Sequence, residues 1–208
     1  MRFPLLVLAA LLLAAPASAQ LMVPLTTPDG RVACSQGMTG LGRPPVWQGA
    51  EDPEGPNGWV LTETVGDPND LRFPLCINEQ AVTRDFDATL RFKILGGSKA
   101  QVGGFVFRAQ SASDYYVVRA SALDNSVRLY RVEKAKRSQI GAKDVPVALD
   151  KWHSLRVVSA GERFEVSFDG QSLFGVTDRT LPQAGAMGVW SQADSRTRYG
   201  SILVSPPR

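Results

Sequence analysis

The sequence predicts an all-β sandwich or barrel, and two observations carry that prediction. Short strand signals recur from about residue 86 to residue 204, with turn signals between them. Over the same region no segment shows a 3.6-residue apolar stripe longer than one short turn near Val145. Many short strands without long helices are typical of sandwiches and barrels.

Two strands show the pattern clearly. Residues 86–95 read FDATLRFKIL, in which alternate residues from Phe86 to Ile94 are apolar and those between are polar. This period of two predicts a strand that is buried on one face only. RFEVSF at 163–168 repeats the pattern, and Asp169-Gly170 then supplies a hairpin turn because glycine accepts positive φ. Further strands are expected at 104–109, 115–120, 127–132, 152–159, 172–176, 185–191 and 201–204.

The N-terminus, MRFPLLVLAALLLAAPASAQ, is typical of a secretory signal peptide, with an early Arg2, an apolar run and a small-residue cleavage site. We expect residues 1–19 to be removed before Gln20, leaving a periplasmic or secreted protein that is not held in a membrane. Pro16 ends the apolar run short of the roughly 20 residues that span a bilayer. Residues 20–58 are rich in Pro and Gly and predict an extended N-terminal segment, with the β-sandwich domain at 59–204.

Charge argues against nucleic acid as a partner. Without Arg2, 22 basic residues face 20 acidic ones, and no long basic block occurs. We interpret the short run Lys134-Ala135-Lys136-Arg137 as a solvated hairpin end.

Cys34 and Cys76 are the two cysteines, and an even number in an exported chain favours a disulfide. A zinc site is not expected, because such sites take four ligands and the chain has one histidine besides these cysteines. No phosphate-binding or dinucleotide-binding fingerprint and no haem-attachment motif occurs, so no metal or cofactor is expected.

The sequence also matches the motifs of common hydrolases only poorly. Asp85 and Asp87 are the nearest approach to the alternating acids of a retaining glycosidase strand, and no third acid follows. His153 lies in a predicted strand, and no nucleophile elbow accompanies it.

The stretch DYYVVRASALDNSVRLYR, residues 114–131, is the strongest candidate for a binding surface. It predicts two strands joined by a turn near Asp124-Asn125. Alternation places Tyr115 and Arg119 together on a solvated face and Tyr116 in the core. Aromatic rings stack on the apolar faces of sugars, and Arg binds their hydroxyl groups. The same residues are also ordinary strand formers whose stems cover apolar surface, so a purely structural role stays open.

Five segments carry a family resemblance: GGFVFR (103–108), DYYVVRASALDNSVRLYRV (114–132), DKWHSLRV (150–157), FDGQSLF (168–174) and GAMGVWSQADS (185–195). In this order they resemble the exported domains of the 3-keto-disaccharide hydrolase-like family, in the concanavalin A-like lectin/glucanase superfamily, and laminin G-like modules share the architecture. The resemblance covers roughly residues 45–204. It implies a jelly-roll sandwich of two antiparallel sheets with any ligand on the concave face. Similar domains follow the A-D-S run with a pair of acids, whereas this chain has Tyr199-Gly200-Ser201-Ile202.

Three functions follow as hypotheses. The first is an exported protein that binds a carbohydrate on the concave face through Arg108, Tyr115, Arg119, Tyr130, Trp190 and Asp194. The second is a glycoside or 3-keto-disaccharide hydrolase in which a pocket carboxylate, Asp194 or Asp124, acts as general acid or base. The third is a structural or protein-interaction module of the cell envelope.

Overall fold

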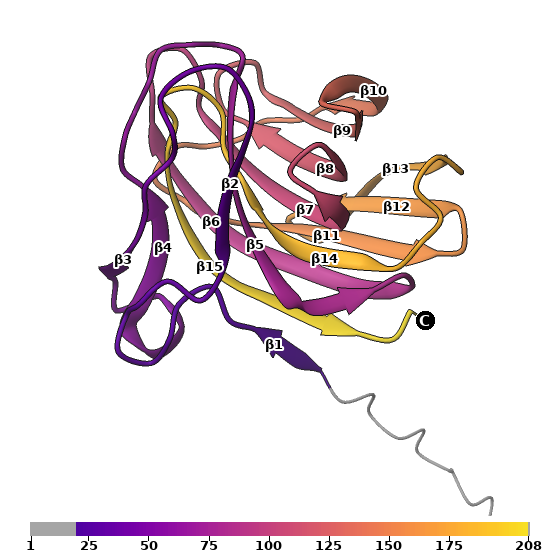
Figure 1. The fold of residues 1–208 in the computed structure, drawn as a ribbon, viewed down its shortest axis with the longest axis horizontal. Helices are drawn as coiled ribbons and strands as arrows, with labels where there is room; N and C mark the ends of the chain where they lie inside the picture. The colour runs from indigo at the N-terminus through magenta and orange to yellow at the C-terminus, as the bar shows by residue number, and fades with distance from the viewer. Residues whose placement is uncertain (1–19, 208) are drawn as a thin grey trace, which may run out of the picture.

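The computed structural model describes residues 20–207, so the expected signal peptide at 1–19 lies outside the described residues. The described chain forms an all-β sandwich of two antiparallel sheets (Figure 1). Its one short 3-10 helix, Pro56–Gly58, lies between β3 and β4. No helix among residues 20–207 is both long enough and apolar enough to cross a membrane.

Eight strands form one sheet, in the order β13 (Gln171–Thr177), β12 (Arg163–Phe168), β11 (Trp152–Ala160), β6 (Phe86–Gly96), β15 (Arg196–Ser205), β4 (Trp59–Glu63) and β3 (Trp47–Glu51), with β1 (Leu21–Val23) also pairing with β15. Seven strands form the other, in the order β10 (Lys136–Asp144), β9 (Ser126–Glu133), β8 (Asp114–Ser121), β7 (Val102–Ser111), β14 (Gly185–Trp190), β5 (Arg72–Thr83) and β2 (Ser35–Gly40). Neighbours in the sheets are often far apart in the sequence, as β14 between β7 and β5 shows.

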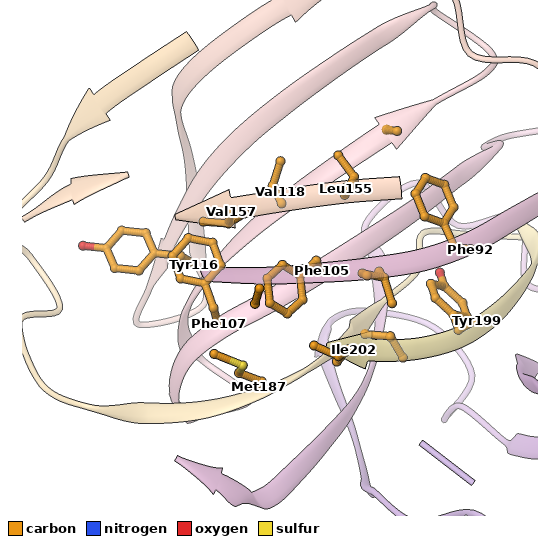
Figure 2. Close-up of a cluster of buried hydrophobic side chains, with 14 of the residues drawn as sticks. Phe92, Phe105, Phe107, Tyr116, Val118, Leu155, Val157, Met187, Tyr199 and Ile202 are labelled. Carbon is orange, nitrogen blue, oxygen red and sulfur yellow. The ribbon is translucent and has the colours of Figure 1, made fainter. Parts of the chain in front are cut away.

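The main core lies between the two sheets. Alternate residues of β6 from Phe86 to Ile94 are all fully buried in it, which confirms the period of two. Rings from β7 and β8, including Phe107 and Tyr116, pack beside aliphatic side chains of β11 such as Leu155 (Figure 2). Tyr116 is therefore a core residue, as its place in the alternation predicts.

The N-terminal segment does not precede the sandwich but is part of it. Strand β2 pairs with β5 in the seven-stranded sheet, β3 pairs with β4 in the other, and β1 pairs with β15. The sandwich thus begins at Leu21 rather than near residue 59. These strands are short and are separated by segments rich in Pro and Gly, so periodicity alone did not reveal them.

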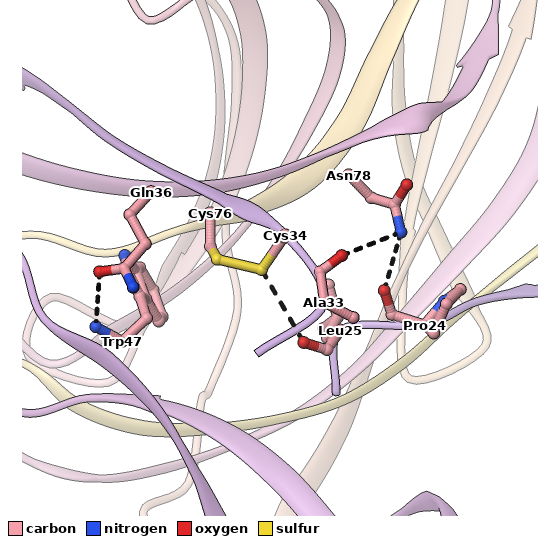
Figure 3. Close-up of a disulfide and its surroundings, with 8 residues drawn as sticks. All are labelled: Pro24, Leu25, Ala33, Cys34, Gln36, Trp47, Cys76 and Asn78. Carbon is pink, nitrogen blue, oxygen red and sulfur yellow. Dashed lines mark hydrogen bonds between the residues drawn. A yellow bond between two sulfur atoms is a disulfide. The ribbon is translucent and has the colours of Figure 1, made fainter. Parts of the chain in front are cut away.

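A disulfide joins Cys34 to Cys76, with the two Cα atoms 5.3 Å apart, which confirms the predicted pairing (Figure 3). Cys76 lies on β5, and Cys34 immediately precedes β2, so the bond ties the edge strand to its neighbour. Asn78 donates from its amide to the carbonyls of Pro24 and Ala33 and holds the preceding segment against the same strand (Figure 3).

A buried ion pair links the two sheets at the other end of the β2–β5 pairing, where Gly40 lies opposite Arg72. Arg72 of β5 donates two hydrogen bonds to the Glu63 carboxylate of β4, at 2.8 and 3.2 Å, and both side chains are excluded from solvent. Arg72 also donates to the carbonyls of Arg43 and Ala193, and Glu63 accepts from two backbone amides. Every nitrogen of the guanidinium and both carboxylate oxygens are thus hydrogen-bonded, and such bonding lets charges be tolerated in a protein interior.

Candidate functional site

The face of the seven-stranded sheet that points away from the main core is strongly concave. Three strands, β5, β14 and β7, separate β2 from β8. A flat sheet would hold β2 and β8 about 19 Å apart, four spacings of about 4.8 Å. The Thr39 hydroxyl of β2 nevertheless lies 2.8 Å from the Tyr115 hydroxyl of β8. We call this surface the concave face.

Aromatic rings form the floor of the concave face. Phe73 of β5 stacks on Trp190 of β14 with their ring centroids 5.4 Å apart. Gly104 of the neighbouring β7 leaves room for the indole, because a Cβ there would lie 3.0 Å from Trp190. Tyr115 and Tyr130 continue the layer, and all four rings are buried. This second apolar cluster is separate from the one between the sheets.

Arg137 of β10 lies over these rings. Its guanidinium carbon is 4.4 Å from the centroid of Phe73, 4.6 Å from that of Tyr130 and 5.7 Å from that of Trp190. Cations are attracted to aromatic faces at such distances. Burial lowers the pKa of Arg137 below its ordinary value, and the nearby charge of Arg119 acts in the same direction. Arg137 is therefore not part of the solvated hairpin end that its place in the run Lys134-Ala135-Lys136-Arg137 predicts. Only Lys134, Ala135 and Lys136 of the run are exposed.

A polar cluster forms one side of the concave face. Arg119 and Arg128 lie opposite each other on β8 and β9, and both reach the carboxylate of Asp124, at 3.3 and 3.7 Å. Ser126 donates to that carboxylate at 2.7 Å, and Arg128 donates to the side-chain oxygen of Gln139 at 3.1 Å. Burial alone would raise the pKa of Asp124, but hydrogen bonds from Arg119 and serine hydroxyls outweigh it and lower the pKa to about 2.

Arg108 does not share this face, contrary to the prediction. Gly104 and Val106 lie opposite Arg119 and Val117, so strict alternation would set Arg108 beside Tyr115. A bulge after Phe107, with Arg108 at φ 49°, turns the side chain to the other side of the sheet. There it is buried, lies 4.9 Å from the Phe164 ring, and donates to the Ser159 hydroxyl and to backbone carbonyls.

Asp194 also lies away from the concave face. Its carboxylate accepts hydrogen bonds from the amides of Ser98, Lys99 and Ala100 and from the Ser98 hydroxyl, at 2.6–3.1 Å. Burial alone would raise the pKa of Asp194, but these bonds outweigh it and lower the pKa to about 2. The residue borders a hollow of about 480 Å³ that none of the floor rings lines. Its contacts identify it as an anchor for the 97–100 loop.

His153 and Asp87, which the sequence offers as candidate catalytic groups, are held in structural contacts. Both nitrogens of His153 are bonded, to Asp169 at 2.8 Å and to the Ala148 carbonyl at 2.9 Å, and the ring packs on Phe168. Asp87 forms a bidentate pair with Arg156. Across the described part of the chain, no three His, Cys, Asp or Glu side chains cluster as a metal site would require.

The structure thus brings together four of the six predicted binding residues, Tyr115, Arg119, Tyr130 and Trp190. Tyr115 is fully buried instead of solvated, because its hydroxyl bonds to Thr39 under the β7–β8 turn. Three further residues of this face, Arg128, Arg137 and Gln139, were not among the predicted binding residues. A signal for Arg128 existed, since it lies two residues before Tyr130 on the same strand face; β10, which carries the other two, lacks apolar alternation.

No protein-family model matches the chain, and no curated protein matches its sequence. Solved structures do resemble it. The carbohydrate-binding module CBM66 from Bacillus subtilis gives a TM-score of 0.64 at 21% identity, covering 81% of this chain and 95% of that one. A Bacillus subtilis protein of unknown function with a galectin-like fold gives 0.59 at 10% identity, over 83% and 90% of the two chains.

A third similar structure is domain 4 of an extracellular arabinanase from Geobacillus stearothermophilus, in complex with arabinotriose. Its TM-score is 0.54 at 11% identity, over 83% of this chain and 82% of that one. The chain is a jelly-roll β-sandwich. At these identities the likeness establishes the fold and carries no residue roles with it.

Proposed function

We propose that this protein is an exported carbohydrate-binding module whose ligand lies on the concave face. One observation carries the proposal: Arg119, Asp124, Arg128 and Gln139 form a partly accessible polar cluster next to a layer of aromatic rings. Sugars combine apolar ring faces with hydroxyl groups, so a surface that offers rings beside directional donors and acceptors suits them. The fold supports the proposal, since a carbohydrate-binding module and a domain solved with arabinotriose share it.

Export is part of the same proposal. The Cys34–Cys76 disulfide supports it, because structural disulfides persist mainly in oxidising compartments such as the periplasm and the cell exterior. The signal-peptide pattern at 1–19 is the second support.

Binding is favoured over hydrolysis by the state of the two candidate acids. A general acid or base works best with a pKa near the working pH. The pKa of Asp194 and that of Asp124 are each lowered to about 2, so both carboxylates stay ionised at neutral pH and are occupied by hydrogen bonds. The resemblance to 3-keto-disaccharide hydrolase-like domains stays a prediction.

The test is a glycan array followed by calorimetric titration of the sugars that bind. We expect Arg128→Gln to weaken binding at least about tenfold, roughly 1.4 kcal/mol, because Arg128 is the most accessible arginine of the polar cluster. Arg163→Gln is the matched control: it removes the same charge from the exposed β12 and should leave affinity unchanged.

An array without ligands, together with capture of a stable protein partner, would favour the interaction module instead. Turnover of a glycoside or 3-keto-disaccharide that Asp194→Asn abolishes would favour the hydrolase.

A further inference from the structure

The concave face holds hydrogen-bond donors that the protein itself does not satisfy. Within residues 20–207, four buried side-chain atoms lack a hydrogen-bond partner of good geometry, and two of them are arginine nitrogens of this face, Arg119 Nε and Arg137 Nη1. A third, Trp190 Nε1, interacts with the Tyr115 hydroxyl within the floor. A buried polar atom without a partner is destabilising, because it has lost its bonds to water and gained none. The two arginine nitrogens are donors that cannot accept, so their missing partner is a group rich in acceptor oxygens.

The concave face also carries more positive than negative charge, which likewise favours a partner with acceptor oxygens. Arg119, Arg128 and Arg137 bring three positive charges, and the ion pairs of the cluster share a single carboxylate, that of Asp124. Neither of these ion pairs includes Arg137. A partly buried guanidinium without a counter-ion favours an anionic partner, and the planar guanidinium matches a carboxylate in two parallel hydrogen bonds.

Arg137 is also placed so that it can move. It lies on β10, an edge strand that pairs within its sheet only with β9, and its guanidinium contacts the floor through ring faces. No ion pair and no side-chain hydrogen bond to a described residue holds the guanidinium there, so a ligand that pairs with it replaces only these ring contacts when the side chain rotates away from the floor. Such a rotation would uncover Phe73, Tyr130 and Trp190 for stacking.

We propose that the concave face selects an acidic sugar, a uronate whose carboxylate pairs with Arg137 and Arg119 while its ring stacks on the floor that Arg137 otherwise covers. The inference rests on the proposed function and specifies its ligand class. Neutral sugars offer the same hydroxyl groups and ring faces but leave the surplus charge unpaired. Arg137 thus covers the aromatic floor in the free protein and binds the carboxylate of the sugar in the complex.

The experiment compares oligomers of galacturonate, glucuronate and mannuronate with their methyl esters, which keep every ring hydroxyl and lose the charge. The purified protein, with its disulfide oxidised, is titrated by calorimetry and by tryptophan fluorescence. We expect at least one acid to bind tenfold or more tightly than its ester, and to change a fluorescence signal that Trp190→Phe removes.

In Arg137→Met, which keeps an unbranched apolar stem but removes the guanidinium and its charge, the ratio of ester to acid dissociation constants should fall toward one. The Arg163→Gln control should leave that ratio unchanged. Equal affinity for acid and ester, binding of neutral sugars alone, or an unaltered preference in Arg137→Met would overturn the acidic-sugar assignment and leave carbohydrate binding in place. Failure of every glycan on the array and of every uronate would overturn both.

Discussion

At the scale of single residues, one carboxylate can hold a loop in place. Asp194 follows β14 and accepts four hydrogen bonds from residues 98–100, which lie almost a hundred positions earlier in the chain. Three of these bonds come from the backbone amides of one turn. A half-buried carboxylate with this many donors is a structural feature as much as a candidate acid.

We therefore expect Asp194→Asn to lower the free energy of unfolding by about 2 kcal/mol, the usual worth of hydrogen bonds to a charged group. The pKa of Asp194 is lowered from 3.8 to about 2 on folding, so its contribution is complete above pH 3.8 and is lost as the pH falls toward 2. Urea denaturation at neutral pH and at steps below pH 4 measures both effects. The stability difference between wild type and variant should shrink across that window, and a constant difference would contradict the assignment.

At the scale of secondary-structure elements, the sheets are joined at one end by polar rather than apolar contact. The Arg72–Glu63 pair connects β5 to β4 in an environment that excludes water. Breaking such a pair by removing one charge leaves the other buried without a partner, which is more costly than losing the pair as a whole.

Glu63→Gln should accordingly destabilise the protein by about 3–5 kcal/mol, whereas the double substitution Arg72→Met with Glu63→Leu should cost less than the single one. The exposed pair Arg163–Glu165 is the control, and Glu165→Gln should change stability by less than about 1 kcal/mol. Thermal and urea unfolding of the four proteins provide the comparison. Equal effects of Glu63→Gln and Glu165→Gln would show that the buried pair is not important for stability.

At the scale of the whole molecule, the disulfide attaches the N-terminal part of the chain to the sandwich. It closes a loop with a sequence separation of 42 between Cys34 and Cys76, and that loop includes β2, β3 and β4. Strands β2 and β3 lie at the edges of the two sheets, where pairing on one side alone holds them, and β4 lies between β3 and β15.

Chain-entropy reasoning predicts that the Cys34→Ala/Cys76→Ala variant loses about 4 kcal/mol of unfolding free energy. Because the loop contains edge strands, hydrogen exchange should accelerate most in β2 and β3 and least in β6, which lies inside its sheet. Denaturation and exchange of the oxidised and double-alanine proteins test this. Equal acceleration of hydrogen exchange in all strands would instead indicate that the disulfide stabilises the whole fold and not the edge strands in particular.

Local pattern predicted much of this architecture because the two-residue period of a strand depends only on neighbouring residues. It identified β6, the β8–β9 hairpin with its turn near Asp124, the β12–β13 turn at Asp169-Gly170, and Tyr116 as core. It did not find β2 or β10, whose apolar residues are too few to alternate, and which are held by pairing with β5 and β9.

The candidate site depended on contacts that no local pattern contains. The bulge between Phe107 and Ser111 reversed the side chain of Arg108, because a bulge shifts the register without leaving a mark in the alternation. The curvature that brings Thr39 to Tyr115, and Arg137 over rings of β5, β9 and β14, arises from the packing of distant strands. Local pattern was enough to predict the sandwich, the disulfide and the place of Tyr116 in the main core, but not the burial of Tyr115. It could not predict which charged side chains lie together on the concave face, since their positions depend on register and curvature across the whole sheet.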